Sequence, residues 1–74
     1  MHLNNIIKNK KYKIKNINAD ELIKRRLYDI GIIKDSKIEL LYISPSKRMK
    51  AYLIKNSILA IRDKDAFFIE VMDD

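Results

Sequence analysis

Cysteine is absent from the 74-residue sequence, and glycine, proline and histidine each occur only once. Without cysteine, neither disulfide bonds nor thiolate-bound metals can stabilise the fold. A single glycine excludes a glycine-rich phosphate-binding loop. One histidine without cysteine leaves too few ligands for an ordinary zinc or iron site. The hydrophobic core therefore has to hold the fold together by itself.

Groups that could carry out catalysis are also scarce. The only histidine, His2, stands next to the first residue, where chains commonly fray. Acidic side chains are paired at three places: Asp20 and Glu21, Asp63 and Asp65, and Asp73 and Asp74. The first pair suits a helix start, the second a turn and the third a solvated end, and none lies in a segment apolar enough for general acid work. We expect a protein that is not an enzyme and has no cofactor, no metal site and no catalytic residues.

The hydrophobic content is 47%, with 14 isoleucines and 7 leucines, which excludes a disordered chain. The length predicts one domain over residues 1–74. The longest apolar run, residues 40–43, falls far short of the roughly 20 residues that span a bilayer. The first residues also lack the apolar run of a signal peptide. These features predict a cytoplasmic protein without membrane insertion.

The net charge of +6 is unevenly distributed along the chain. Residues 1–16 contain five lysines and no acid, whereas residues 57–74 contain two basic and five acidic side chains. Two readings remain open: a solvated basic face, or a face that binds a polyanion. Lysine dominates arginine by 12 to 4, and nucleic-acid-binding surfaces usually combine arginine with interleaved aromatic residues.

The spacing of apolar residues predicts one strand followed by one helix. Residues 12–17 alternate between polar and apolar side chains, as in a strand. Apolar residues then recur at Ile23, Leu27 and Ile30, which places them on one stripe of a helix over residues 19–30. Asn18 is the predicted N-cap, and Gly31 suits the left-handed position after the last turn.

After Gly31 the period changes to two, which predicts four more strands. The expected turns are residues 44–47, residues 56–57 and the polar link 62–65. The side chains predicted to face inward, together with Tyr12 of the first strand, are Ile38, Leu40, Tyr52, Ile54, Leu59 and Ile61. Tyr42 shares the face of Ile38 and Leu40 but stands at a strand end, where it could contact a partner, and the last strand carries Phe67, Ile69 and Val71. The fold class is therefore mainly β, a small antiparallel barrel of about five strands with one short helix between the first and second strands.

The opposite phase of these strands carries Leu41, Ile43, Ala51 and Leu53. Either the helix and the N-terminal segment cover these side chains, or they form an exposed apolar patch that binds a protein. In the second case Leu41, Ile43 and Leu53 are the predicted docking residues. A basic rim would steer an acidic partner towards them, and it consists of Arg25, Lys47, Arg48 and Lys50.

Three segments resemble the FeoA family in order and spacing. These are the helix end at residues 25–32 (RRLYDIGI), the strand at 58–62 (ILAIR) and the strand at 65–71 (DAFFIEV). Asn56 stands where the family usually has a turn glycine, and a second such glycine is replaced near Asp35. The resemblance implies an SH3-like barrel acting in the cytoplasm with FeoB, the GTP-driven ferrous-iron permease. The alternatives are a small basic nucleic-acid-binding barrel and a generic SH3-like protein-interaction module.

Overall fold

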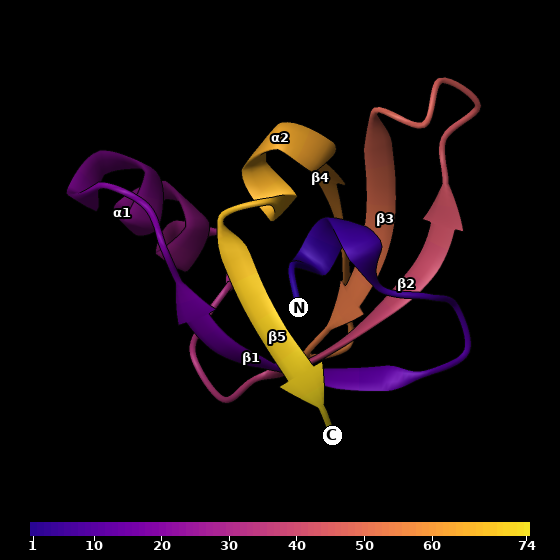
Figure 1. Cartoon of the computed structure of the whole chain (residues 1–74), viewed down its shortest axis with the longest axis horizontal. Helices are drawn as coiled ribbons and strands as arrows, with labels where there is room; N and C mark the ends of the chain where they lie inside the picture. Colours follow the sequence, from indigo (N-terminus) through magenta and orange to yellow (C-terminus); the bar gives the residue numbers. More distant parts are fainter.

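Five antiparallel strands form one strongly bent sheet in the computed structural model, which describes residues 1–74 (Figure 1). The strands are β1 (Lys11–Ile17), β2 (Lys37–Ile43), β3 (Met49–Ile54), β4 (Ser57–Arg62) and β5 (Ile69–Asp73). Their order across the sheet is β4-β3-β2-β1-β5, so β4 and β5 are its edges. The mainly-β fold and the helix between the first two strands are confirmed.

Helix α1 (Glu21–Asp29) connects β1 to β2. Its N-cap is Asp20, whose carboxylate accepts a hydrogen bond from the Ile23 N–H at 3.0 Å. The predicted cap, Asn18, is wrong because its backbone N–H donates to the Phe68 carbonyl (2.7 Å) and so prolongs the pairing of β1 with the C-terminal segment. The predicted role of Gly31 is confirmed, since its φ of 103° lies in the left-handed region.

The predicted polar link at residues 62–65 is instead part of a short helix, α2 (Asp63–Ala66). The Phe67 N–H donates to the Asp63 carbonyl at 3.0 Å, so Phe67 still belongs to the helical turn. Its predicted place on the last strand is therefore wrong, and its side chain is exposed. A 3-10 helix, η1 (Leu3–Asn5), packs beside α2. No helix has both the length and the apolar character needed to cross a membrane.

The core lies inside the curved sheet, and every buried residue is hydrophobic. Tyr12 and Tyr52 are the largest of its fully buried side chains, which confirms their inward positions. Leu27 is the only buried residue of α1, whereas Ile30 of the predicted stripe is 46% exposed. The helix therefore rests on the barrel mainly through one leucine, with half-buried Ile23 beside it.

A β-bulge in β2 changes which side chains face the core. Leu40 pairs with Tyr52 and Tyr42 pairs with Ala51, so Leu41 is the extra residue. Beyond the bulge the phase of β2 is reversed, and Tyr42 is 59% exposed instead of inward. Ala51, predicted to face outward, is buried. Ala51 nevertheless keeps its outward face, paired with Tyr42 and Ala60, and does not belong to the core cluster. Only the position of Tyr42 is changed by the inserted residue, which alternation alone does not reveal.

The tight turns use residues other than glycine. Lys55 and Asn56 have φ values of 49° and 64°, the conformation of a two-residue hairpin turn between β3 and β4. Asp35, before β2, has a φ of 72°. Asp and Asn tolerate this region better than most residues because their short side chains bond locally. The turns thus keep the left-handed geometry of the glycines that they replace.

Replacing Leu27 by alanine should lower the free energy of unfolding by about 2–5 kcal/mol, because it leaves a cavity beneath α1. Leu22 lies on the same helix but is 71% exposed, so Leu22→Ala should change stability by less than about 0.5 kcal/mol. Urea unfolding followed by circular dichroism measures both. Equal effects would show that α1 does not depend on Leu27.

Candidate partner-binding surface

The polar side chains that could serve chemistry have structural partners instead. No group of three or more His, Asp or Glu side chains could hold a metal ion. The His2 ring stacks on Phe67, with ring centroids 4.5 Å apart, and its Nδ1 lies 2.8 Å from the Phe67 carbonyl oxygen. His2 thereby fastens the N-terminal segment to the end of α2.

Lysines of the N-terminal half meet the acidic C-terminal strand. Lys10 lies 3.0 Å from Asp73, and this hydrogen-bonded carboxylate raises the pKa of Lys10. Lys15 and Glu70 are 3.7 Å apart, and Lys37 and Asp74 are 3.5 Å apart. Because β1 and β5 are neighbours, the basic and acidic ends of the sequence partly neutralise each other. The reading of the N-terminal lysines as an unopposed basic face loses support.

Lys50 lies inside the structure rather than on an open rim. Its ammonium donates to the Asn4 carbonyl at 2.6 Å and lies 3.5 Å from the Asp63 carboxylate, with 12% of the side chain exposed. These contacts tie β3 to η1 and α2. Three buried polar atoms near this link have no hydrogen-bond partner: Asn4 Oδ1, Tyr52 OH and Asp63 Oδ1. Burial raises the pKa of the Tyr52 phenol strongly, and the charge of Asp63 adds to this effect.

The bulge separates the three predicted docking residues. Ile43 pairs with Lys50, which shares a face of β3 with Tyr52, whereas Leu53 points to the other face. Leu41, the bulged residue, is half-buried, Ile43 is exposed at the end of β2, and Leu53 is half-buried. The structure therefore does not bring Leu41, Ile43 and Leu53 together as one patch.

Apolar side chains gather instead on the outer face of β2, β3 and β4. The members of this outer strip are Tyr42, Leu53, Ile58 and Ala60. Ala51 pairs with both Tyr42 and Ala60, and Leu53 pairs with Ile58, which is 65% exposed. The alternation of residues 57–62 already assigns Ile58 and Ala60 to this face, but Tyr42 joins it only through the bulge.

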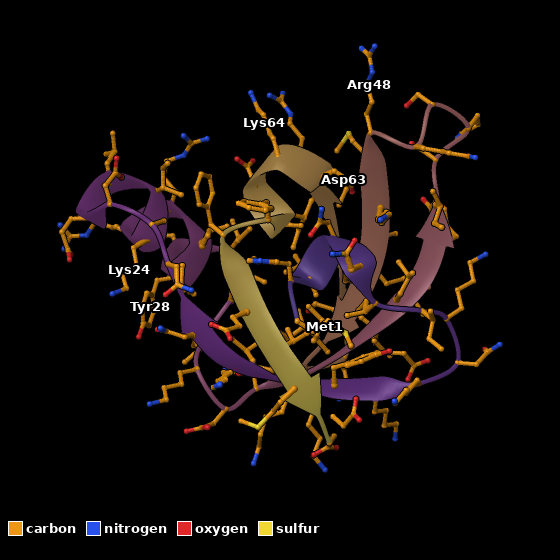
Figure 2. The ribbon with its side chains drawn as sticks, viewed as in Figure 1. Met1, Lys24, Tyr28, Arg48, Asp63 and Lys64 are labelled. Atoms are coloured by element: carbon orange, nitrogen blue, oxygen red, sulfur yellow. The ribbon has the colours of Figure 1, made fainter.

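Four exposed basic side chains surround a hollow between the β2–β3 loop and α2. This basic pocket is formed by Lys47, Arg48, Arg62 and Lys64, and its volume is about 750 Å³. Asp63 is the only acid that lines it, and this carboxylate pairs with Lys50. Figure 2 shows Arg48 and Lys64 extending from neighbouring elements at the same end of the molecule. Lys47 and Arg48 belong to the basic rim that the sequence predicts. Arg62 and Lys64 do not, because the sequence places them in the polar link between two strands.

The fourth predicted rim residue, Arg25, lies elsewhere. It is exposed on α1, beside Lys24 and Tyr28. Figures 1 and 2 show α1 on the opposite side of the molecule from the β2–β3 loop. The predicted rim is therefore replaced by a pocket that combines two of its residues with two from the β4–α2 junction.

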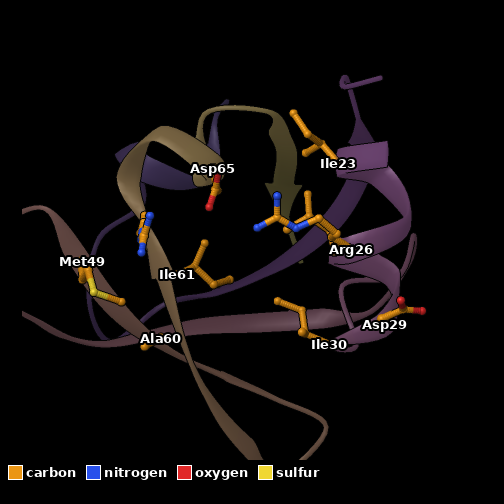
Figure 3. A pocket seen from close by; sticks show the side chains of 10 residues that line it. Ile23, Arg26, Asp29, Ile30, Met49, Ala60, Ile61 and Asp65 are labelled. Carbon is orange, nitrogen blue, oxygen red and sulfur yellow. The ribbon is translucent and has the colours of Figure 1, made fainter. Parts of the chain in front are cut away.

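A groove of about 410 Å³ separates α1 from β4 (Figure 3). Its apolar lining includes Leu27 and Ile30 from the helix and Ala60 and Ile61 from the strand. Its charged lining is balanced, with Arg26 and Arg62 against Asp29 and Asp65. Met49 and Arg62 line both this α1–β4 groove and the basic pocket, so the two hollows adjoin.

The family model of the FeoA domain matches residues 1–73. The chain belongs to the FeoA domain family. The resemblance found in the helix end and two strands is thereby confirmed. This family is a transport-associated, SH3-like accessory domain and not a known family of enzymes. No curated protein sequence matches the chain.

Solved structures of FeoA proteins have the same fold. The FeoA-like protein of Clostridium acetobutylicum is 23% identical, with a TM-score of 0.89 over 99% of this chain and 85% of that one. Iron(II) transport protein A of Clostridium thermocellum is 22% identical, with a TM-score of 0.93, and the match covers 99% of this chain but 45% of that one.

A third similar structure is FeoA of Stenotrophomonas maltophilia in complex with zinc. It is 18% identical, with a TM-score of 0.82 over 97% of this chain and 89% of that chain. That protein is described as a prokaryotic SH3 domain protein and a possible activating factor of bacterial ferrous iron transport. At these identities the likeness shows the fold, and the SH3-like prediction is confirmed.

Replacing Lys50 by methionine should lower the free energy of unfolding by about 1–3 kcal/mol, because the part-buried Asn4 carbonyl and the Asp63 carboxylate lose the ammonium that they contact. Lys47→Met, in the exposed loop, should change it by less than about 0.5 kcal/mol. Urea unfolding measures both values. Equal stabilities would assign Lys50 no role in holding η1 and α2.

Tyr52→Phe should change the pH dependence of stability. Above pH 10 an unfolded tyrosine loses its proton, whereas the folded Tyr52 retains it, so the wild type loses up to about 1.4 kcal/mol of stability per pH unit there. The phenylalanine variant lacks this contribution and should gain on the wild type between pH 9 and 11. The exposed Tyr28→Phe serves as the control and should follow the wild type. Parallel curves for all three proteins would contradict the burial of the Tyr52 phenol.

Proposed function

We propose that this protein is a non-enzymatic, cytoplasmic accessory protein of ferrous iron transport. Its partner is the permease FeoB, and the contact is with the cytoplasmic portion of that permease. Membership of the FeoA family supports this assignment, as does the description of the Stenotrophomonas maltophilia protein as a possible activating factor. The role is that of an adaptor that binds and modulates, since no residues converge for catalysis.

The observation that carries the proposal is the basic pocket beside the outer strip. Lys47, Arg48 and Lys64 are exposed and have no acidic partner within 4.0 Å, in contrast to lysines 10, 15 and 37. Unpaired charge of one sign steers an oppositely charged protein surface and sets its orientation. The neighbouring Tyr42 and Ile58 supply apolar area that such a partner can cover.

The two components have different tasks in this adaptor. The basic pocket increases the rate of encounter with an acidic surface, which falls as salt rises. The outer strip supplies contact area that excludes water once the partner is bound. Leu53 pairs with Ile58 and so belongs to the outer strip. It is the only one of the three predicted docking residues that does.

The basic pocket also distinguishes this proposal from nucleic-acid binding. A phosphate backbone would need a longer basic track than four side chains at one end, and Lys10 and Lys15 are paired with acids of β5. Phosphate binding also weakens about 10³-fold or more between 50 and 200 mM salt when several contacts form. An acidic protein surface with apolar contacts should lose much less affinity over that range.

The double variant Arg48→Glu/Lys64→Glu should weaken binding to the purified cytoplasmic portion of FeoB at least tenfold, because two attractions become repulsions. Isothermal titration calorimetry of the full chain measures the affinity. The matched control, Lys24→Glu/Arg25→Glu on α1, makes the same change in net charge and should bind within about twofold of the wild type. Both doubles are surface changes, and thermal melts confirm their folds.

Absence of binding by the wild type, or equal losses in the two double variants, would refute the proposed function. Tighter binding of a 20-base-pair DNA duplex than of the permease portion would assign the pocket to nucleic acid instead.

A further inference from the structure

The two edges of the sheet are protected very differently. Along β5, the Val71 N–H donates to the Met1 carbonyl at 2.7 Å, and His2 forms a bridge with Glu70, so the N-terminal segment covers this edge. No segment pairs with the outer edge of β4. Residues 57–61, Ser-Ile-Leu-Ala-Ile, contain neither a charge nor a proline. Proteins usually blunt such an edge to prevent unwanted pairing, so an open apolar edge indicates a use.

The register identifies the backbone groups that are free on this edge. The two-residue turn makes Ile54 and Ser57 a hydrogen-bonded pair, and such pairs alternate along an antiparallel ladder. The bond from the Asp63 N–H to the Arg48 carbonyl (2.9 Å) continues the same alternation. The N–H and C=O groups of Ile58 and Ala60 and the N–H of Arg62 therefore point away from β3, and none of them takes part in a hydrogen bond outside the strands. The Arg62 carbonyl belongs to the N-cap of α2.

These free groups face the α1–β4 groove. Ala60 and Arg62 line it from the strand, and Ile30 lines it from the helix (Figure 3). An extended chain lying along β4 would place its backbone against Ile58, Ala60 and Arg62. Its side chains would alternate between the groove and the outer strip. The far end of this path opens into the basic pocket through Arg62 and Met49.

We infer that the α1–β4 groove binds an extended segment of a partner protein as an added strand, antiparallel to β4, with acidic residues at the N-terminal end of that segment. Antiparallel pairing is slightly the more stable arrangement. It places the start of the segment beside Arg62 and the basic pocket, where Lys47, Arg48 and Lys64 attract acids. Apolar residues at alternate positions would contact Ile30 and Ile61 in the groove.

The occupant is a single strand and not a second copy of this chain. Helix α1 lines the far side of the groove, and a second barrel would have to bring its own α1 into the same space. Strand addition of this kind obtains affinity from main-chain hydrogen bonds and specificity from alternate side chains. The inference rests on the proposed function for the identity of the partner, but not for the manner of binding.

The probe is a synthetic octapeptide, Asp-Asp-Val-Thr-Ile-Ser-Val-Thr, with blocked ends. Fluorescence polarisation with the full chain should show saturable binding. The same composition with the two acids at the C-terminal end should bind at least fivefold more weakly. A version N-methylated at alternate residues on the side that faces β4 should bind at least tenfold more weakly, because it cannot donate to the edge. In amide exchange, the N–H groups of Ile58 and Ala60 should gain protection only when the first peptide is bound.

Ala60→Pro removes one free N–H from the edge without removing a bond to β3, a position where strands tolerate proline. It should weaken peptide binding at least tenfold, whereas Ala60→Ser, which keeps the N–H, should stay within about twofold. If the proline variant unfolds, the N-methylated peptide still decides the question. No saturable binding by the first peptide, or binding that N-methylation leaves unchanged, overturns the inference.

The proposed function fails separately. Permease binding that survives Ala60→Pro but is lost in Arg48→Glu/Lys64→Glu would refute strand addition and leave the adaptor role intact. Peptide binding at the β4 edge without any permease binding would refute the adaptor role and support strand addition.

Discussion

The β-bulge in β2 is the constraint on which the arrangement of the binding surface depends. One extra residue, Leu41, reverses the alternation of β2 beyond Leu40. Tyr42 is therefore turned outward to join Ile58 and Ala60, while Ile43 is turned to the face of Lys50. Bulges also increase the local bend of a strand, which suits a sheet that has to curve around a core built by only 74 residues. A regular β2 would leave the outer strip without its aromatic residue.

The distribution of charge over the folded surface differs from its distribution along the sequence. The lysine-rich start of the chain lies next to the acidic final strand, where two ion pairs join the two parts, and Lys37 of β2 pairs with Asp74. Exposed pairs of this kind contribute little stability because water and salt screen them. Their main consequence is electrostatic, because they leave the basic pocket at the β2–β3 loop as a concentrated positive region. Four of the 16 basic side chains thus gather around one hollow, where Asp63 is the only acid.

A chain with one glycine has to form its turns with other residues. Asn9, Asp35, Lys47, Lys55 and Asn56 all have positive φ values between 49° and 72°. For residues such as lysine this conformation costs about 1–2 kcal/mol. Lys47 lies at the basic pocket, so the residue that bears this backbone strain also contributes positive charge there. The dense isoleucine core has to offset these costs, and the two buried tyrosines give it much of its volume.

The sequence alone determined the features that follow from local spacing. The helix before Gly31, the strands, the hairpin turn at Asn56 and the inward positions of Tyr12 and Tyr52 all depend on alternation or on single-residue preferences. Family membership was also readable, because residues 25–32 and 58–62 kept a recognisable pattern. The exposure of Lys47 and Arg48 was also predictable, since a polar loop between two strands usually lies on the surface.

The tertiary structure decided what depends on contacts between distant residues. The bulge at Leu41 is defined by the pairing of β2 with β3, which the sequence does not show. The periodicity of β2 alone therefore placed Leu41, Ile43 and Leu53 on one face, although the bulge separates them. Lys50 has the sequence context of a surface lysine, but its contacts with Asn4 and Asp63 bury most of its side chain. Arg62 and Lys64 joined the basic pocket only because α2 forms beside the β2–β3 loop. Alternation and capping depend on residues that are close in the sequence. A pocket forms where segments that are distant in the sequence pack together, and the sequence does not show which segments these are.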